Sequence, residues 1–135
     1  WRLHLDAPPE EAYRMVACAE GRQRFWAESA PESGGVIQFV FPNGWEYAGR
    51  ITHTEPPAIF QVEYFGSQVT FHFKSDLAGG TELELVDRGV SNEDRTEVIA
   101  GWVSVLMSLK AALDFGVDLR NHDPARTWEH EYTNN

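Results

Sequence analysis

The stretch 97–115, EVIAGWVSVLMSLKAALDF, limits the possible folds more than any other part of the chain. At helical periodicity its large apolar side chains gather on one face and its polar side chains on the other. The apolar face holds Val98, Ile99, Trp102, Val105, Leu106, Leu109, Ala112 and Leu113, and the opposite face holds Glu97, Ser104, Met107 and Asp114. About 19 residues at a rise of ~1.5 Å give a helix that is roughly as long as a small domain is wide. Because most of the preceding chain has strand-like patterns, this helix and one sheet must cover each other's apolar faces.

The N-terminal quarter predicts one strand and two short helices. Residues 1–6 alternate between apolar and polar side chains, as a half-buried strand does. Asp6 is the expected N-cap of a helix over residues 8–17, whose prolines suit a first turn. A second short helix that ends at Phe25-Trp26 is expected within residues 18–27. We place Cys18 on a helix among apolar neighbours and interpret it as an inert core thiol.

Short strands joined by tight turns fill the middle of the chain. After a turn over residues 31–35, the strand candidates are 36–41, 45–54, 59–65, 68–75 and 81–88. Strands this short with turns this tight pair antiparallel. The predicted fold class is α+β, with one domain over residues 1–135. A curved, six-stranded antiparallel sheet grips a long C-terminal helix, and two short helices follow the first strand.

The composition narrows the range of partners. The formal net charge of -10 opposes binding to nucleic acid, because phosphates carry the same sign. A single cysteine excludes an intrachain disulfide and agrees with a cytoplasmic location. No apolar run is long enough for us to expect membrane insertion.

The C-terminal tail, residues 116–135, is polar but contains Trp128 and Tyr132, which are spaced to share a face if the segment is helical. We expect the tail to pack back on the body or on a neighbouring subunit, which leaves a homodimer open. Residues 118–123 either form one rim of a pocket or an oligomer contact, or only hold the tail through caps and ion pairs.

Several local motifs, in order and at matching spacing, are similar to those of a known family. They are Leu5-Asp6-Ala7-Pro8-Pro9-Glu10-Glu11-Ala12-Tyr13, Phe25-Trp26, Gly34-Gly35, Gly49-x-Ile51 followed by Pro56-Pro57, Gly80-Thr81-x-Leu83, and Gly101-Trp102 with Leu106, Leu109 and Leu113. Residues 3–116 thereby resemble the START-like (SRPBCC, helix-grip) superfamily. Within it they look most like the activator of heat-shock-protein-90 ATPase homologue family.

The resemblance implies a hydrophobic pocket between the sheet and the long helix. We therefore expect non-enzymatic binding of a small hydrophobic molecule or lipid. The expected ligand-binding residues are Trp45, Tyr47, Phe60, Tyr64, Phe71, Phe73, Leu85, Trp102, Leu106 and Leu109. The alternative is that these large rings fill the space completely.

Two further functions follow from the resemblance alone. One is a co-chaperone or stress-related module that contacts a chaperone ATPase. The other is a cyclase-like enzyme that uses the pocket. Asp87 is the single catalytic candidate, since strand alternation turns it inward, and it stands where many relatives carry His. The structural alternative is that Asp87 caps residues 91–94 or pairs with Arg88, Arg95 or another arginine.

No metal site or cofactor is predicted. The histidines, His4, His53, His72, His122 and His130, do not form a ligand motif together or with Cys18.

Overall fold

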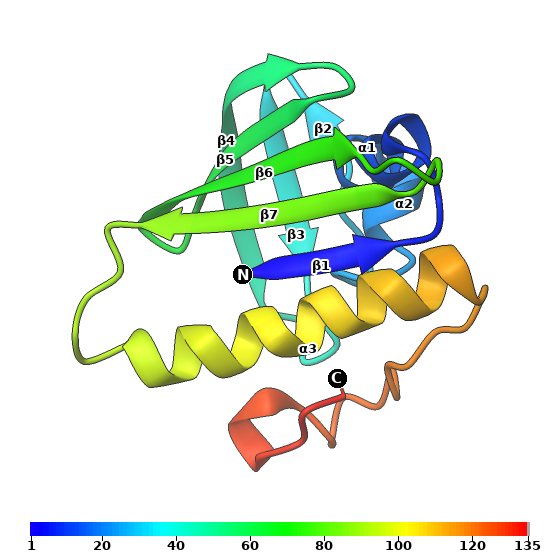
Figure 1. Cartoon of the computed structure of the whole chain (residues 1–135). Coiled ribbons are helices and arrows are strands. Elements are labelled where there is room, and N and C mark those ends of the chain that lie inside the picture. Colours follow the sequence, from blue (N-terminus) through cyan, green and yellow to red (C-terminus); the bar gives the residue numbers. More distant parts are fainter. Residues whose placement is uncertain (135) are drawn as a thin grey trace.

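Seven strands form one antiparallel sheet in the order β1-β7-β6-β5-β4-β3-β2 in the computed structural model, which describes residues 1–134 (Figure 1). The strands are β1 (Arg2–Leu5), β2 (Glu32–Ser33), β3 (Val36–Val40), β4 (Glu46–Glu55), β5 (Ile59–Tyr64), β6 (Ser67–Ser75) and β7 (Thr81–Arg88). The predicted α+β architecture is confirmed. The strand count differs by one, because Glu32 and Ser33 pair with β3 where only a turn was expected.

Four helical segments are found within residues 1–134: α1 (Pro9–Ala17), α2 (Ala19–Arg22), α3 (Arg95–Asp114) and the 3-10 turn η1 (Trp128–His130). Figure 1 shows α3 running beside β1 across one side of the sheet, with the C-terminal segment turning back along it. The helices and the tail therefore lie over one face and the open end of the sheet, where they cover the apolar side chains of the strands.

The core forms where the inward side chains of β5, β6 and β7 meet α3. The register places Phe71 opposite Leu85 and Phe73 opposite Leu83, so large side chains lie side by side across the β6–β7 pair. The buried α3 side chains that cover them include Trp102, Leu106, Leu109 and Ala112.

Gly49 allows β4 to bend close over β5. A Cβ atom at this position would lie 2.8 Å from the carbonyl oxygen of Glu63. The pairing shifts register just beyond it, between Ile51 and His53. A residue without a side chain is therefore required where the sheet curves.

A buried arginine organises the segment between α2 and the sheet. Arg22 is 0% exposed, and its guanidinium donates to the carbonyl oxygens of Val16, Ala17 and Ala30 at 2.8–3.1 Å. Burial lowers the pKa of this group. The three carbonyls stand in for the carboxylate partner that a buried cation usually has.

Three local predictions at the N-terminal end are wrong. Asp6 does not cap α1, since the N-cap is Pro8 and makes no side-chain bond. Cys18 does not lie inside a helix, because its extended backbone separates α1 from α2. The second helix forms as predicted but ends at Arg22 and not at Phe25-Trp26, because the chain turns to bring Trp26 under the sheet.

Two side chains of α3 lie on the opposite side from the predicted one. Ile99 is 43% exposed, because the first turns of α3 extend past the end of the sheet. The Asp114 side chain is fully covered, since it accepts bonds from the Lys110 ammonium at 2.6 Å and from the Asp6 backbone N–H at 3.1 Å. The loop after β1 thus covers the end of the helix that was expected to face water.

The helix α3 is the one helix within residues 1–134 that is long and apolar enough to cross a membrane. No membrane-spanning helix was predicted from the apolar runs of the sequence. Here its Trp102, Leu106 and Leu109 side chains are buried against the sheet, as in a core helix.

Candidate functional site

A cavity of about 580 Å³ opens at the end of the sheet where α3 begins. Its walls come from the β3–β4 turn, the β7–α3 connection, the N-terminal half of α3 and the C-terminal tail. The lining residues are Trp26, Ala27, Phe41, Pro42, Asn43, Trp45, Tyr64, Phe65, Ser67, Asp87, Gly89, Val90, Ser91, Asp94, Glu97, Val98, Gly101, Trp102, Ser104, Val105, Arg120, Trp128 and Glu129. The cavity exists because the first turns of α3 extend past the strands, so no strand fills the space beneath them.

Trp26 fills the middle of the space between the sheet and α3, and it closes the cavity on its inner side. Its ring centroid lies 5.0 Å from Phe39, 5.3 Å from Tyr64, 5.6 Å from Phe71 and 5.7 Å from Trp102. Aromatic rings at these separations pack favourably. The space between sheet and helix is thus solid under Trp26, and the hollow lies to one end of it.

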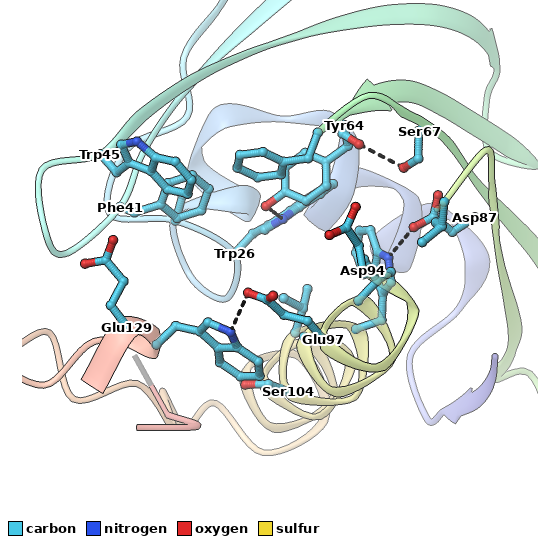
Figure 2. Close-up of a pocket in the computed structure, with 18 of the residues that line it drawn as sticks. Trp26, Phe41, Trp45, Tyr64, Ser67, Asp87, Asp94, Glu97, Ser104 and Glu129 are labelled. Atoms are coloured by element: carbon cyan, nitrogen blue, oxygen red, sulfur yellow. Dashed lines mark hydrogen bonds between the residues drawn. The ribbon is translucent and has the colours of Figure 1, made fainter. Parts of the chain in front are cut away.

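Two polar contacts are built into the inner wall (Figure 2). The Trp26 indole N–H donates to the Tyr64 hydroxyl at 3.1 Å. The Trp102 indole N–H donates to Asp87 Oδ2 at 2.8 Å. Burial raises the pKa of Tyr64, so its phenol stays protonated. The hydroxyl proton of Tyr64 has no protein acceptor among the hydrogen bonds of residues 1–134.

Asp87 differs from both structural roles that the sequence suggested. It neither caps residues 91–94 nor pairs with Arg88 or Arg95 within the described chain. One carboxylate oxygen binds the Trp102 indole, whereas Oδ1 is buried without a hydrogen-bond partner in residues 1–134. Asp87 therefore presents an unsatisfied acceptor beside the cavity, and its catalytic role stays a prediction.

The outer rim of the cavity is acidic. Asp94 accepts a bond from Ser91 Oγ at 2.7 Å, and Glu97 accepts one from the Trp128 indole N–H at 3.1 Å. Glu129 also lies at the rim, where its Oε2 accepts a bond from the side-chain amide of Asn43 at 3.4 Å. Figure 2 shows Glu97 and Glu129 on the same side of the opening, facing Phe41 and Trp45.

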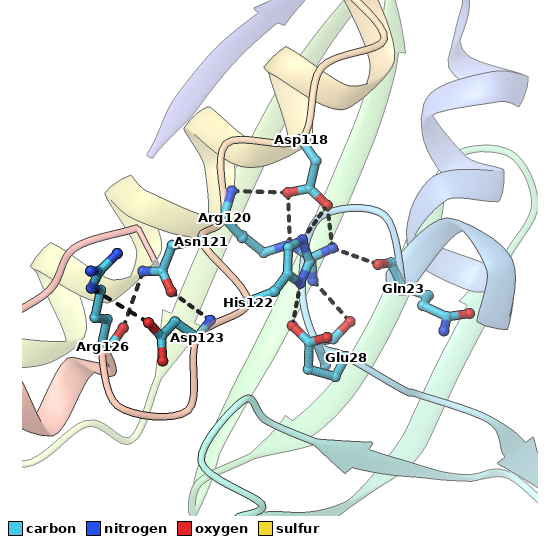
Figure 3. Close-up of polar contacts among 9 residues, drawn as sticks. Gln23, Glu28, Asp118, Arg120, Asn121, His122, Asp123 and Arg126 are labelled. Atoms are coloured by element: carbon cyan, nitrogen blue, oxygen red, sulfur yellow. Dashed lines mark hydrogen bonds and ion pairs between the residues drawn. The ribbon is translucent and has the colours of Figure 1, made fainter.

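Arg120 holds the tail against the body (Figure 3). Its buried guanidinium donates to the carbonyl oxygens of Gln23 at 2.7 Å and Ala27 at 2.9 Å, and to both oxygens of Asp118. Burial would raise the pKa of Asp118, but bonds from the Arg120 side chain and backbone outweigh it and lower the pKa to about 2. This network places the following residues, up to Trp128 and Glu129, along the cavity.

His122 extends the same network at the surface. Its ring nitrogens lie 2.6 Å from Glu28 and 3.1 Å from Asp118. Trp128 and Tyr132 were predicted to share one face if the tail were helical. They do not, because the helical turn η1 ends at His130, before Tyr132. Trp128 is half-buried against α3, whereas Tyr132 is exposed.

The structure brings only part of the predicted ligand-binding set to the cavity. Trp45, Tyr64 and Trp102 line it. Tyr47 stacks on Phe65 at 4.2 Å without lining the cavity. The remaining six, Phe60, Phe71, Phe73, Leu85, Leu106 and Leu109, are core residues. They share the correct face of the sheet or helix, but Trp26 stands between them and the hollow.

Several lining residues were not among the predicted ligand-binding residues, and most of them lie outside periodic elements. They include Trp26, Phe41, Phe65, Asp94, Glu97, Trp128 and Glu129. A weak signal existed for two of them, since Trp26 belongs to a family motif and Trp128 is a large side chain in a polar tail. Within residues 1–134, no three His, Cys, Asp or Glu side chains are grouped as metal ligands.

Comparison with known proteins now decides the family. Residues 6–114 match the family described as Activator of Hsp90 ATPase homolog 1-like protein. The chain belongs to this family. The resemblance noted from the sequence motifs is thereby confirmed, and Asp87 lies inside the matched region.

Solved structures of related proteins share the helix-grip fold. A protein from Staphylococcus saprophyticus has a TM-score of 0.74 at 22% identity, covering 87% of this chain and 91% of its own. The Aha1 dimer from Colwellia psychrerythraea has a TM-score of 0.73 at 20% identity, covering 86% and 95%. DynU16, from the dynemicin biosynthetic locus, has a TM-score of 0.71 at 22% identity, covering 86% of this chain and 46% of that one. Identities this low show the fold alone. No protein of curated function matches the chain significantly.

Proposed function

We propose that this protein binds a small, largely apolar ligand in the cavity, without catalysing a reaction. The observation that carries the proposal is the hollow of about 580 Å³ with a largely apolar wall that includes several aromatic rings. Ligand pockets typically have volumes of roughly 300–1,000 Å³ and are mostly apolar, with a few polar groups that orient the ligand. The proposed contacts are Trp45, Tyr64 and Trp102. Trp45 is 59% exposed at the mouth, where a ligand would cover it.

The polar groups of the inner wall support an oriented ligand. The Tyr64 hydroxyl has a proton free to donate, and Asp87 Oδ1 has a lone pair free to accept. A buried polar atom without a partner is costly, so a ligand that satisfies both groups would gain affinity and adopt one orientation.

Native mass spectrometry of the protein purified from its own host tests the proposal. We expect a stoichiometric small-molecule passenger, identified after extraction. Gly101 offers a matched blocking variant, since it lines the cavity and a Cβ there meets no atom within 4 Å. Gly101→Phe should fold and lose the passenger. Ala100→Phe, on the exposed neighbouring position outside the cavity, should retain it. A passenger that survives in Gly101→Phe, or a wild-type protein that is empty and binds no apolar probe, would contradict the proposal.

A second candidate function is a protein-interaction module, in line with the family description. The observation in its favour is an exposed apolar stripe on α3, formed by Ile99, Val103 and Met107 at successive helical turns. We propose this stripe as the contact with a second copy or with a chaperone ATPase. Analytical ultracentrifugation and a pull-down with Val103→Asp would test it. Unchanged association in that variant would remove the stripe from consideration.

A further inference from the structure

The walls of the cavity carry an excess of negative charge. Asp87 lies at the end of β7. Asp94 and Glu97 lie at the start of α3, and Glu129 lies in the tail. Asp94 and Glu97 have a structural reason to be acidic, since they lie at the positive end of the α3 dipole. Asp87 and Glu129 come from segments far apart in the sequence. Figure 2 shows Asp94 and Glu97 between Asp87 at one end of the cavity and Glu129 at the other.

The one basic residue in the lining does not balance this charge. Arg120 binds both oxygens of Asp118 and the carbonyl oxygens of Gln23 and Ala27, so its donors are already engaged. Among the described lining residues there is no other Lys, Arg or His. Arg95 borders a neighbouring hollow that also touches Asp87, but it forms no ion pair with Asp87 in residues 1–134.

Three of the four tryptophans in the wall present rings rather than free donors. The indole N–H groups of Trp26, Trp102 and Trp128 already bind Tyr64, Asp87 and Glu97. An anionic head group would find these donors occupied. A cation, in contrast, is attracted by the faces of aromatic rings, and most strongly by those of tryptophan.

Asp87 supplies a further acceptor for a positively charged donor. Its Oδ1 atom is buried and has no hydrogen-bond partner within the described chain. A bond from a charged N–H to such an oxygen is stronger than one between neutral groups. The same atom would repel a carboxylate or phosphate.

We propose that the ligand of this cavity is an organic cation, a protonated amine carried on an apolar body. This inference rests on the proposed ligand-binding function and specifies its ligand class. The apolar body lies against the aromatic wall, and the ammonium group lies between Asp87 and Glu97, beside Asp94. Neutral and anionic molecules with the same apolar body bind more weakly.

Isothermal titration calorimetry at neutral pH with decylamine and decanoate below their micelle concentrations, and with decanol below its solubility limit, tests this inference. The three probes share one chain and differ in the charge of the head group. We expect decylamine to bind about tenfold more tightly than decanol, and decanoate to bind most weakly. Added salt should weaken decylamine binding and leave decanol binding unchanged.

Charge-removing variants locate the head group. Glu97→Gln should reduce decylamine affinity several-fold and leave decanol affinity unchanged. Asp87→Asn should also reduce decylamine affinity several-fold and should reduce decanol affinity less, since an amide oxygen still accepts a bond from a hydroxyl but no longer attracts a cation. Glu93→Gln is the matched control, because Glu93 is exposed in the connection between β7 and α3 and does not line the cavity. It removes the same charge and should have no effect on either probe.

The outcomes separate this inference from the function on which it rests. Equal affinities for decylamine and decanol would overturn the cation preference while supporting an apolar binding site. Tightest binding of decanoate would overturn the cation preference as well. Binding of none of the probes would count against the proposed function itself, and equal losses in Glu97→Gln and Glu93→Gln would show a general charge effect instead of a site.

Discussion

The Trp102 indole N–H donates to the Asp87 carboxylate at 2.8 Å, and this bond joins the middle of α3 to the end of β7. It lies at the boundary between the solid core and the cavity, since Trp102 belongs to both and is 4% exposed. The bond therefore fixes where the packed part of the helix ends and the hollow begins.

Replacing Trp102 separates packing from hydrogen bonding. Trp102→Ala should lower the free energy of unfolding by about 3–5 kcal/mol, because a large buried ring is lost. Trp102→Phe keeps most of the ring but leaves Asp87 without its donor, and should cost about 1–3 kcal/mol. Urea unfolding measures both values. A much smaller loss in Trp102→Ala would show that this ring is solvated within an open cavity.

Arg120 should decide whether the tail stays attached. Arg120→Ala leaves the carbonyl oxygens of Gln23 and Ala27 without their donor, so we expect a loss of about 2–4 kcal/mol in unfolding free energy. Hydrogen exchange should accelerate over residues 117–134, as measured by mass spectrometry. Arg126→Ala is the control, since Arg126 is exposed and pairs only with Asp123. Equal exchange in the two variants would mean that Arg120 does not hold the tail.

Asp118 gives the tail contact a defined pH dependence. Because folding lowers its pKa from 3.8 to about 2, its contribution to stability is complete only above about pH 5 and is lost progressively as the pH falls through 3.8 and about 2. The Asp118 side chain is 36% exposed, so solvent screening limits the contribution to roughly 1 kcal/mol or less.

The variant Asp118→Asn lacks this contribution at every pH. The difference in unfolding free energy between wild type and variant should be constant above about pH 5 and should disappear toward about pH 1. Acid titration followed by urea unfolding measures it, and NMR of the carboxyl carbon gives the pKa directly. A difference that grows on acidification would reverse the assigned sign.

The buried Arg22 should tolerate neither an apolar nor a conservative replacement. Arg22→Met leaves the carbonyl oxygens of Val16, Ala17 and Ala30 unpaired, with an expected loss of about 2–4 kcal/mol. Arg22→Lys keeps the charge but cannot reach all three acceptors in the planar geometry of a guanidinium, so it should also destabilise the protein. The exposed Arg14→Met serves as the control in thermal unfolding. A stable Arg22→Met protein would show that the segment before β2 does not depend on these bonds.

The sequence by itself determined the elements and their faces. Alternation over residues 59–65, 68–75 and 81–88, together with the period of the last helix, predicted the antiparallel sheet and the helix that covers it. The inward positions of Phe71, Leu85 and Leu109 followed from the same patterns. Periodicity within one element is sufficient for this, because each side chain's face is set by the local backbone geometry.

Only the tertiary structure decided where the cavity lies and what lines it. Trp26 enters the core from an aperiodic segment and fills the space that Phe60, Phe71 and Leu106 were expected to line. Trp128 and Glu129 reach the opening because Arg120, nearby in the tail, finds carbonyl oxygens far away in the sequence. A cavity forms where elements fail to pack against one another. That outcome depends on long-range contacts among whole elements, and the pattern of any single element does not contain it.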